Sequence, residues 1–277
     1  QFPSTQQEAF MYSGRKVFDS GLLSRLKSGI KEPIFQGMML GGRPNPTIGG
    51  SLWVWEWPQS GKEYDLAVDP SIGLEGGDFS AIQVVERGSY KQVAEWQDRI
   101  DVTEIVRLIE QLGKMYNTAQ VAVELNGPGF IINNELQRTY PRLYRWRYRD
   151  TPNLKPSTRT SWITTTKSKD FMISMATITM SRHPDIVRSQ RLWDELTTYV
   201  RHGNRCEAEY NCFDDLCSAY MISLVISDDE NYDRRGFYDL PEVKDEKKPF
   251  HVSQLPFMRD NFDPAVEETK KSSWLEY

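Results

Sequence analysis

Acidic side chains stand where three apolar segments of the chain end or begin. Asp69 and Glu124 each follow a short apolar run, and the pair Asp214 and Asp215 opens a longer one. If the two short runs are neighbouring strands, their acids emerge side by side at one sheet edge, where a packed helix can add the third carboxylate. Such hard oxygen ligands suit Mg²⁺ or Mn²⁺, and two of these ions clamp the attacking and leaving oxygens in phosphodiester cleavage.

Each acid also has an ordinary structural role. Asp69 precedes Pro70, a combination that is typical of turns. An aspartate at a helix start, such as Asp214 or Asp215, caps backbone N–H groups and suits the helix dipole. The metal hypothesis therefore depends on finding one acid at each of three separate element ends, in a chain whose elements come in the right order.

The elements that must position these acids are predicted from periodicity. Short apolar runs and glycine-rich turns predict three antiparallel strands between residues 64 and 98. Asp101 and Glu104 stand at the N-cap and third positions of a helix, and the apolar residues up to Leu112 keep helical spacing. The later elements are predicted as a strand over 121–123, a helix opening at 127–129, a strand over 143–148, and helices over 168–182, 189–199 and 213–227.

This order predicts an α/β fold with a central mixed β-sheet, an antiparallel three-strand meander plus parallel strands, flanked by α-helices. With 277 residues, the chain is long enough for one large domain. Glycine and proline punctuate residues 1–63, which predicts an N-terminal arm or extended edge ahead of a domain over 64–227. Residues 228–277 are predicted as an acidic C-terminal tail, because eight acids face three basic residues between 228 and 246.

Charge is distributed unevenly along the chain. The formal net charge of -5 argues against a uniformly basic nucleic-acid coat protein, yet residues 138–169 hold nine basic residues and one acid, a net +8. Arginines there alternate with Tyr144, Trp146 and Tyr148, so they either pair with phosphates or simply face water while the aromatic rings pack in the core. The candidate DNA-binding residues are Arg142, Arg145, Arg147, Arg149, Arg159, Lys167 and Lys169.

Several other classes of protein fit poorly. Cys206, Cys212 and Cys217 have neither CxxC nor zinc-framework spacing and are interpreted as free thiols. No apolar run approaches the roughly 18 residues that a membrane helix needs. The chain begins at Gln1 without a leader segment, which suggests a piece of a longer polypeptide.

Three motifs surround the acids, in chain order. They are Leu66-Ala67-Val68-Asp69-Pro70 with Gly76-Gly77-Asp78-Phe79-Ser80, then Val121-Ala122-Val123-Glu124-Leu125-Asn126-Gly127-Pro128-Gly129, then Phe213-Asp214-Asp215-Leu216-Cys217-Ser218-Ala219-Tyr220. Together they resemble the ribonuclease H-like nuclease domain of the terminase large subunit of tailed bacteriophages. Residues 2–19 also look like the join between that family's packaging ATPase and its nuclease, so the resemblance covers about 1–227.

The resemblance implies a ribonuclease H-like fold and a metal-dependent endonuclease that cuts concatemeric double-stranded DNA with little sequence specificity. Carried over by position, the catalytic metal ligands would be Asp69, Glu124 and one or both of Asp214 and Asp215, with Asp78 assisting. Two Mg²⁺ or Mn²⁺ ions would be the cofactors. Some related folds place a further acid one helical turn after the last aspartate, where this chain has Ser218.

The resemblance also implies partners and a location. These are the portal protein, the small terminase subunit and an ATPase domain of the same polypeptide, in the host cell cytoplasm and transiently at the procapsid portal, with no membrane. The phosphate-loop pattern G-x-x-x-x-G-K-[ST] occurs nowhere in the chain, so the ATPase is expected to lie outside it.

Two rival hypotheses remain open. One is another nuclease of the same superfold, either a Holliday-junction resolvase or a transposase-like recombinase, which branched and linear substrates would separate. The other is a non-catalytic module that docks on DNA or on a portal ring and retains the acids only for structure.

Overall fold

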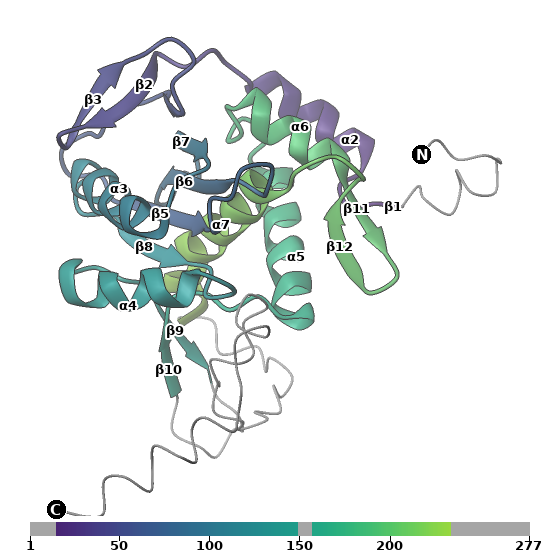
Figure 1. Ribbon diagram of the computed structural model, residues 1–277. Coiled ribbons are helices and arrows are strands. Elements are labelled where there is room, and N and C mark those ends of the chain that lie inside the picture. The colour runs from purple at the N-terminus through teal and green to yellow at the C-terminus, as the bar shows by residue number, and fades with distance from the viewer. Residues whose placement is uncertain (1–14, 149–156, 234–277) are drawn as a thin grey trace, which may run out of the picture. The chain divides into compact units, whose positions relative to one another are not determined.

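The computed structural model describes residues 15–148 and 157–233. At its centre lies a seven-stranded mixed sheet with helices on both faces (Figure 1). In spatial order the strands are β3 (Arg43–Pro46), β2 (Phe35–Leu40), β4 (Leu52–Val54), β7 (Gln92–Asp98), β6 (Ser80–Glu86), β5 (Tyr64–Asp69) and β8 (Gln120–Val123). The predicted α/β architecture, a central mixed sheet flanked by helices, is confirmed.

Strands β5, β6 and β7 form the predicted antiparallel meander, and β8 joins β5 in parallel. Leu66, Ala67 and Val68 of β5 are all fully buried, because helices cover both faces of the sheet. This is why the strand reads as a continuous apolar run rather than as an alternating one. The run ends at Asp69, where the strand reaches the sheet edge.

Two helical layers cover the sheet (Figure 1). On one face, α3 (Val102–Met115) and α4 (Gly129–Thr139) pack Ile109 and Ile132 into a cluster with Val68. On the other face, Ala67 shares a cluster with side chains of four helices. These helices are α2 (Ser20–Leu26), α5 (Thr166–Arg182), α6 (Gln190–Thr198) and α7 (Asp215–Asp233).

Side-chain caps start the helices where the sequence indicates. The Asp101 carboxylate accepts hydrogen bonds from the N–H groups of Thr103 (2.7 Å) and Glu104 (3.0 Å), as the predicted N-cap of α3 requires. Thr165 and Ser168 form a reciprocal capping box at the start of α5. Helices α5, α6 and α7 lie within a few residues of their predicted ranges, and α7 continues to Asp233, past residue 227.

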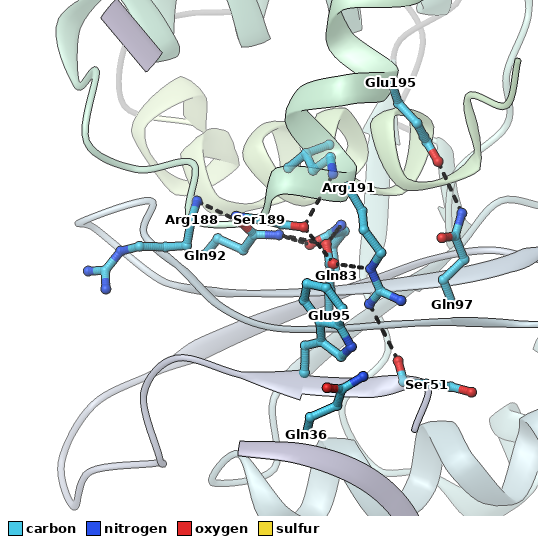
Figure 2. Close-up of polar contacts among 12 residues, drawn as sticks. Gln36, Ser51, Gln83, Gln92, Glu95, Gln97, Arg188, Ser189, Arg191 and Glu195 are labelled. Atoms are coloured by element: carbon cyan, nitrogen blue, oxygen red, sulfur yellow. Dashed lines mark hydrogen bonds and ion pairs between the residues drawn. The ribbon is translucent and has the colours of Figure 1, made fainter. Parts of the chain in front are cut away.

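A buried polar network holds the start of α6 on the sheet (Figure 2). The Glu95 carboxylate of β7 is fully buried and accepts hydrogen bonds from the Ser189 hydroxyl (2.6 Å) and from Arg191 Nε (2.8 Å). Gln92 Oε1 accepts the N–H groups of Arg188 and Ser189, each at 2.8 Å. Because these buried groups are paired with one another, they fix one docking position for α6.

The described part of residues 1–63 is packed into the domain. Strand β4 pairs with β7, and β2 and β3 extend the sheet beyond it, so this segment forms an extended edge of the sheet. Farther towards the N-terminus, Leu22 and Leu26 of α2 are fully buried between the helices. No detached arm exists within 15–63, and the proposed boundary at residue 63 cuts across one continuous sheet.

The strand predicted over 143–148 is only partly right. Leu143 makes a bridge to Val121 of β8, and the chain then leaves the sheet as the hairpin of β9 (Arg145–Tyr148) and β10 (Ser157–Thr160). It returns at Trp162, whose N–H donates to the Val123 carbonyl (3.0 Å). The two short segments on either side of the hairpin therefore together line the outer edge of β8.

A second small sheet was not predicted. Strands β1 (Arg15–Lys16), β11 (Tyr199–His202) and β12 (Arg205–Ala208) form it in the order β1-β11-β12. A 3₁₀ turn, η1 (Lys27–Gly29), follows α2. Within the described ranges, no helix is long and apolar enough to cross a bilayer.

Candidate active site

Asp69 and Glu124 lie side by side at the end of two parallel strands. Val68 of β5 and Val123 of β8 are paired in register, and the Glu124 N–H donates to the Val68 carbonyl (2.9 Å). Side chains one residue beyond this pair therefore leave the sheet at the same edge. The sequence-predicted neighbourhood of these two acids is present in the structure.

Helix α7 begins at the same edge and brings a third acid. Asp215 is the first residue of the helix, and its Oδ2 accepts a hydrogen bond from the Phe79 N–H (3.3 Å) at the end of the β5–β6 loop. The Asp214 carbonyl accepts the N–H of Ser218 (2.8 Å), so Asp214 stands at the helix start. Both aspartates thus stand at the start of α7, and Asp215 also lines a pocket with the acids of the sheet.

These acids surround a pocket of about 460 Å³. Asp69, Asp78, Glu124 and Asp215 all line it, together with Asn126. The rest of the wall is apolar or glycine: Pro70, Ile72, Gly73, Leu74, Gly77, Gly127 and Pro128, with Ser71 beside them. Four carboxylates from three separate parts of the chain therefore share one pocket.

The carboxylates in this pocket repel one another. Burial raises the pKa of Asp69 well above its ordinary value, and the nearby charges of Glu124, Asp215 and Asp214 raise it further. Burial also raises the pKa of Asp215, to about 7, with added contributions from Asp214 and Asp78. A cation in the pocket would relieve this repulsion and favour the ionised forms.

Asp214 has a different environment from Asp215. Burial raises the pKa of Asp214, while the Lys169 ammonium and a hydrogen bond from the Ala208 backbone act in the opposite direction. Asp214 does not line the pocket, although the charges of Asp78 and Glu124 reach it. Of the two aspartates, Asp215 is the one that the fold turns into the pocket.

The chemistry of the donor set fits a divalent cation. All four pocket acids offer carboxylate oxygens, which Mg²⁺ and Mn²⁺ prefer over nitrogen or sulfur ligands. Across residues 15–148 and 157–233, no group of three or more His, Cys, Asp or Glu side chains already has a metal-binding arrangement. The acids therefore share a pocket and would have to turn towards an entering ion.

Glu124 is held from several directions. Asn126 Nδ2 donates to Glu124 Oε1 (3.3 Å) and to the Thr164 carbonyl (2.9 Å), which ties the acid to the segment before α5. Gly129 packs so closely on Glu124 that a Cβ atom at that position would lie 1.7 Å from the Glu124 carbonyl oxygen. The backbone around Glu124 is thus fixed by contacts that a periodicity analysis does not reveal.

The two predicted lysines differ in their surroundings. Lys169 is half-buried, with its ammonium 5.6 Å from the centre of the Tyr199 ring, and its charge acts on Asp214. Lys167 lies in the first turn of α5 and is exposed. Lys169 is therefore a predicted basic residue whose charge acts on an acid at the start of α7.

The two predicted arginines whose side chains are described, Arg142 and Arg145, do not line the pocket. Arg142 donates to Glu63 (2.8 Å), just ahead of β5, whereas Asp69 lies at the far end of that strand. Arg145 is exposed at the start of β9, while Arg147 in β9 and Arg159 in β10 are placed by the backbone of the hairpin. Arg149 lies outside the described residues.

The aromatic residues of the basic segment pack in the core where they can be described. Tyr144 is 2% exposed, and Trp146 stacks on buried Trp162 with ring centres 5.0 Å apart. Arg145, between them, faces water. For these residues the structure agrees with the simpler alternative, in which aromatic rings face the core and arginine is solvated.

Comparison with solved structures identifies the fold of this chain. No family model matches the chain, and no curated protein matches it. Among solved structures, the large terminase nuclease from thermophilic phage G20c with bound magnesium has a TM-score of 0.53 at 16% identity, over 73% of this chain and 95% of that chain. The chain has the fold of a large terminase nuclease. The expected ribonuclease H-like architecture is thus confirmed.

Two further structures of the same phage nuclease give the same result. One matches with a TM-score of 0.52 at 17% identity, over 78% of this chain and 98% of that chain. The other, with bound cobalt, matches with a TM-score of 0.53 at 18% identity, over 73% and 95%. At such low identity, these terminase nuclease likenesses establish the arrangement of elements alone.

Sequence reasoning missed Asn126, which lines the pocket, and also Phe79 and Arg99, which contact Asp215 and Gly77 respectively. Phe79 and Asn126 lie inside the quoted motifs, one position after Asp78 and two positions after Glu124, so motif proximity was a usable signal. Arg99 carries no local signal, because the contacts described for its side chain are to residues twenty or more positions away.

Proposed function

We propose that this chain is a divalent-metal-dependent DNA endonuclease, the nuclease part of a viral genome-packaging terminase. The observation that carries the proposal is the meeting of Asp69, Glu124 and Asp215 in one pocket at the edge of a sheet with the large terminase nuclease fold. The similar phage nuclease was crystallised with magnesium and with cobalt, which supports a divalent ion here.

Asp69, Glu124 and Asp215 would hold Mg²⁺ or Mn²⁺, with Asp214 and Asp78 close enough to assist. Two bound metal ions would act as Lewis acids that stabilise the charge on the phosphate, and they would lower the pKa of a bound water molecule. The protein's own part is to present ionised carboxylates. Because the pKa of Asp69 and that of Asp215 are raised, their protons must leave as a cation enters.

Neighbouring residues set the shape of the site. Asn126 holds Glu124 Oε1 in place, and the Phe79 N–H orients Asp215. Lys169, beside Asp214, offers the positive charge that a DNA phosphate needs when it approaches an acidic pocket. The apolar side chains of Ile72 and Leu74 form part of the pocket wall and are themselves exposed.

We assign DNA binding to the basic hairpin and the start of α5. The contributing residues would be Arg145, Arg147, Arg149, Arg159, Lys167 and Lys169. Arg142 is engaged by Glu63 at the other end of β5, so it would contribute only to a longer DNA path. Arginine and lysine contacts to phosphates position DNA without reading bases, so little sequence specificity is expected.

The biological role follows from the proposed family. A packaging nuclease cuts concatemeric double-stranded DNA and works with an ATPase of the same polypeptide, a small subunit and a portal, in the host cell cytoplasm. In this proposal, the described part of residues 1–63 belongs to the nuclease domain with 64–227, because one sheet crosses residue 63, and residues 228–277 supply the acidic tail.

The test is cleavage of supercoiled plasmid, linear duplex and a four-way junction in Mn²⁺, Mg²⁺ or EDTA. Metal-dependent cutting of plasmid and linear DNA supports the terminase nuclease. Strong preference for the junction favours a resolvase of the same superfold. DNA binding without cleavage in either metal favours a non-catalytic docking module and contradicts the proposal.

A further inference from the structure

We infer that Arg99 is a positioning residue for the acidic pocket, acting through the β5–β6 loop. This inference rests on the proposed function, since it concerns the metal affinity of the same carboxylates. Arg99 itself touches none of the pocket acids in the contacts described. Its role is to hold the loop that carries Asp78 and Phe79.

Arg99 contacts the β5–β6 loop at two residues. Its Nε donates to the Gly77 carbonyl (2.9 Å), and its guanidinium lies 4.0 Å from the centre of the Phe79 ring. A planar guanidinium can make both contacts at once, whereas a lysine ammonium cannot lie flat on a ring while donating sideways. The two contacts bracket Asp78.

The base of Arg99 is itself fixed. Its N–H donates to Asp98 Oδ1 (2.8 Å), and the other oxygen of Asp98 accepts the Ser51 hydroxyl of the sheet edge. The side chain therefore projects from an anchored backbone. Because its backbone is fixed, the Arg99 side chain restrains the loop and does not simply follow the movements of the loop.

The loop also meets the following segment through backbone. Gly73 has φ of +71°, and a Cβ atom there would lie 2.3 Å from the Ile100 carbonyl oxygen, so only glycine fits. At the base of the loop, the Ser71 N–H donates to Ser80 Oγ (3.0 Å). Leu74 and Gly76, which follow Gly73 in the loop, are exposed, and Arg99 contacts the loop just after them.

The held loop in turn orients the acids. The Phe79 N–H donates to Asp215 Oδ2 (3.3 Å), and the Phe79 ring meets Phe213 edge to face with centres 4.9 Å apart. Phe213 stands two residues before Asp215, so both sides of the α7 start depend on the position of Phe79. Movement of this loop would displace Asp78 and weaken the hold on Asp215.

A purely structural role for Arg99 makes a different prediction. Loss of its contacts would then lower the melting temperature while the metal affinity of the folded protein stayed unchanged. The positioning role predicts weaker metal binding with little change in melting temperature, because the loop is a surface element whose position matters more to the pocket than to the core. Metal affinity and stability must therefore be measured separately.

The experiment is calorimetric titration of the DNA-free chain with Mn²⁺, alongside melting in EDTA. Arg99→Ala should weaken Mn²⁺ binding roughly tenfold, equivalent to about 1.4 kcal/mol, and Arg99→Lys should lose less. The matched control is Arg107→Ala on α3, whose side chain is 68% exposed and pairs with Glu104. If Arg99→Ala does not fold, Arg99→Met replaces it with the same expectation, because it removes the donor but keeps an apolar contact on Phe79.

Wild-type affinity in Arg99→Ala or Arg99→Met would overturn the inference while leaving the proposed function intact. A lower melting temperature with unchanged Mn²⁺ affinity would do the same. If the wild type binds no Mn²⁺, or if Asp69→Asn binds it equally well, both the inference and the metal site of the proposed function fail.

Discussion

The Glu124 N–H donates to the Val68 carbonyl at 2.9 Å. Asp69 follows Val68 in β5, so this one hydrogen bond places Glu124 beside Asp69. It joins acids that are 55 positions apart in the sequence, 124 minus 69. Every other feature of the pocket is arranged around this pair: Asp215 arrives with α7, and Asn126 holds the Glu124 side chain. The following predictions test that arrangement.

Gly129→Ala should damage the site through the backbone of Glu124. A methyl group there would overlap the Glu124 carbonyl, and overpacking of this kind costs about 1–3 kcal/mol. We expect Mn²⁺ affinity of the folded protein to fall as Glu124 is displaced. Gly88→Ala is the control, since Gly88 has φ of +85° and open space around it, so it adds strain without a clash. Equal Mn²⁺ affinity in the two variants would contradict the prediction.

Asp215→Asn should weaken Mn²⁺ binding more than Asp214→Asn. Asp215 lines the pocket, whereas Asp214 does not line it and has the Lys169 charge acting on it, which partly offsets the effect of burial on its pKa. Loss of one carboxylate ligand is expected to cost at least tenfold in affinity, or about 1.4 kcal/mol. Calorimetric titration of both variants measures this, and the opposite order would show that Asp214 is the principal ligand.

Lys169→Ala should weaken DNA binding by a charge effect. In EDTA, the slope of log affinity against log salt concentration should fall by about one, because one phosphate contact is lost. Fluorescence anisotropy across a salt series checks this. Lys114→Ala is the control, since Lys114 lies on α3 and pairs with Glu110. An unchanged slope for Lys169→Ala would remove Lys169 from the DNA path.

Glu195 should make stability fall with rising pH. Burial raises its pKa to about 8, although the Cys217 N–H and the Gln97 side chain both donate to it. Figure 2 shows the contact with Gln97. Because the folded pKa lies above that of the unfolded chain, the Glu195 contribution is full below pH 4.5 and is lost as pH rises to about 8. The free energy of unfolding should therefore decline by at most about 1.4 kcal/mol per pH unit across that window.

Glu195→Gln should flatten this dependence. The new amide can donate to Gln97 once that side chain rotates, and it still accepts the Cys217 N–H, so both contacts survive. Urea unfolding at several pH values compares the variant with the wild type. Glu135→Gln on α4 is the control, because Glu135 is half-exposed and pairs with Arg138. The same decline in Glu195→Gln as in the wild type would assign the pH effect to another group.

Local patterns carried most of the prediction of the meander and the helices. Leu66, Ala67 and Val68 of strand β5 form an apolar run because helices cover both faces of the sheet, and α3 has Asp101 at its N-cap. Each of these elements is therefore predicted by a few consecutive residues. The neighbourhood of Asp69 and Glu124 followed from one further step, the placement of two such strands side by side.

Non-local contacts account for what the sequence did not indicate. Strands β2 to β4 lie in a segment rich in glycine and proline, and only pairing of β4 with β7 draws them into the sheet. The hairpin of β9 and β10 interrupts the edge of β8, which no periodicity marks. Arg99 gains its role from Gly77 and Phe79, both distant in the chain, and isolated charged residues give no sign of such contacts.

The central claim is that Asp69 belongs to a metal-dependent nuclease site, and plasmid cleavage tests it most directly. Supercoiled plasmid is incubated in Mn²⁺ with the wild type, with Asp69→Asn and with the control Glu135→Gln, and each reaction is repeated in EDTA. The account predicts nicked and linear products from the wild type and the control only, and none in EDTA. Equal cleavage by Asp69→Asn, or cleavage that persists in EDTA, would contradict it.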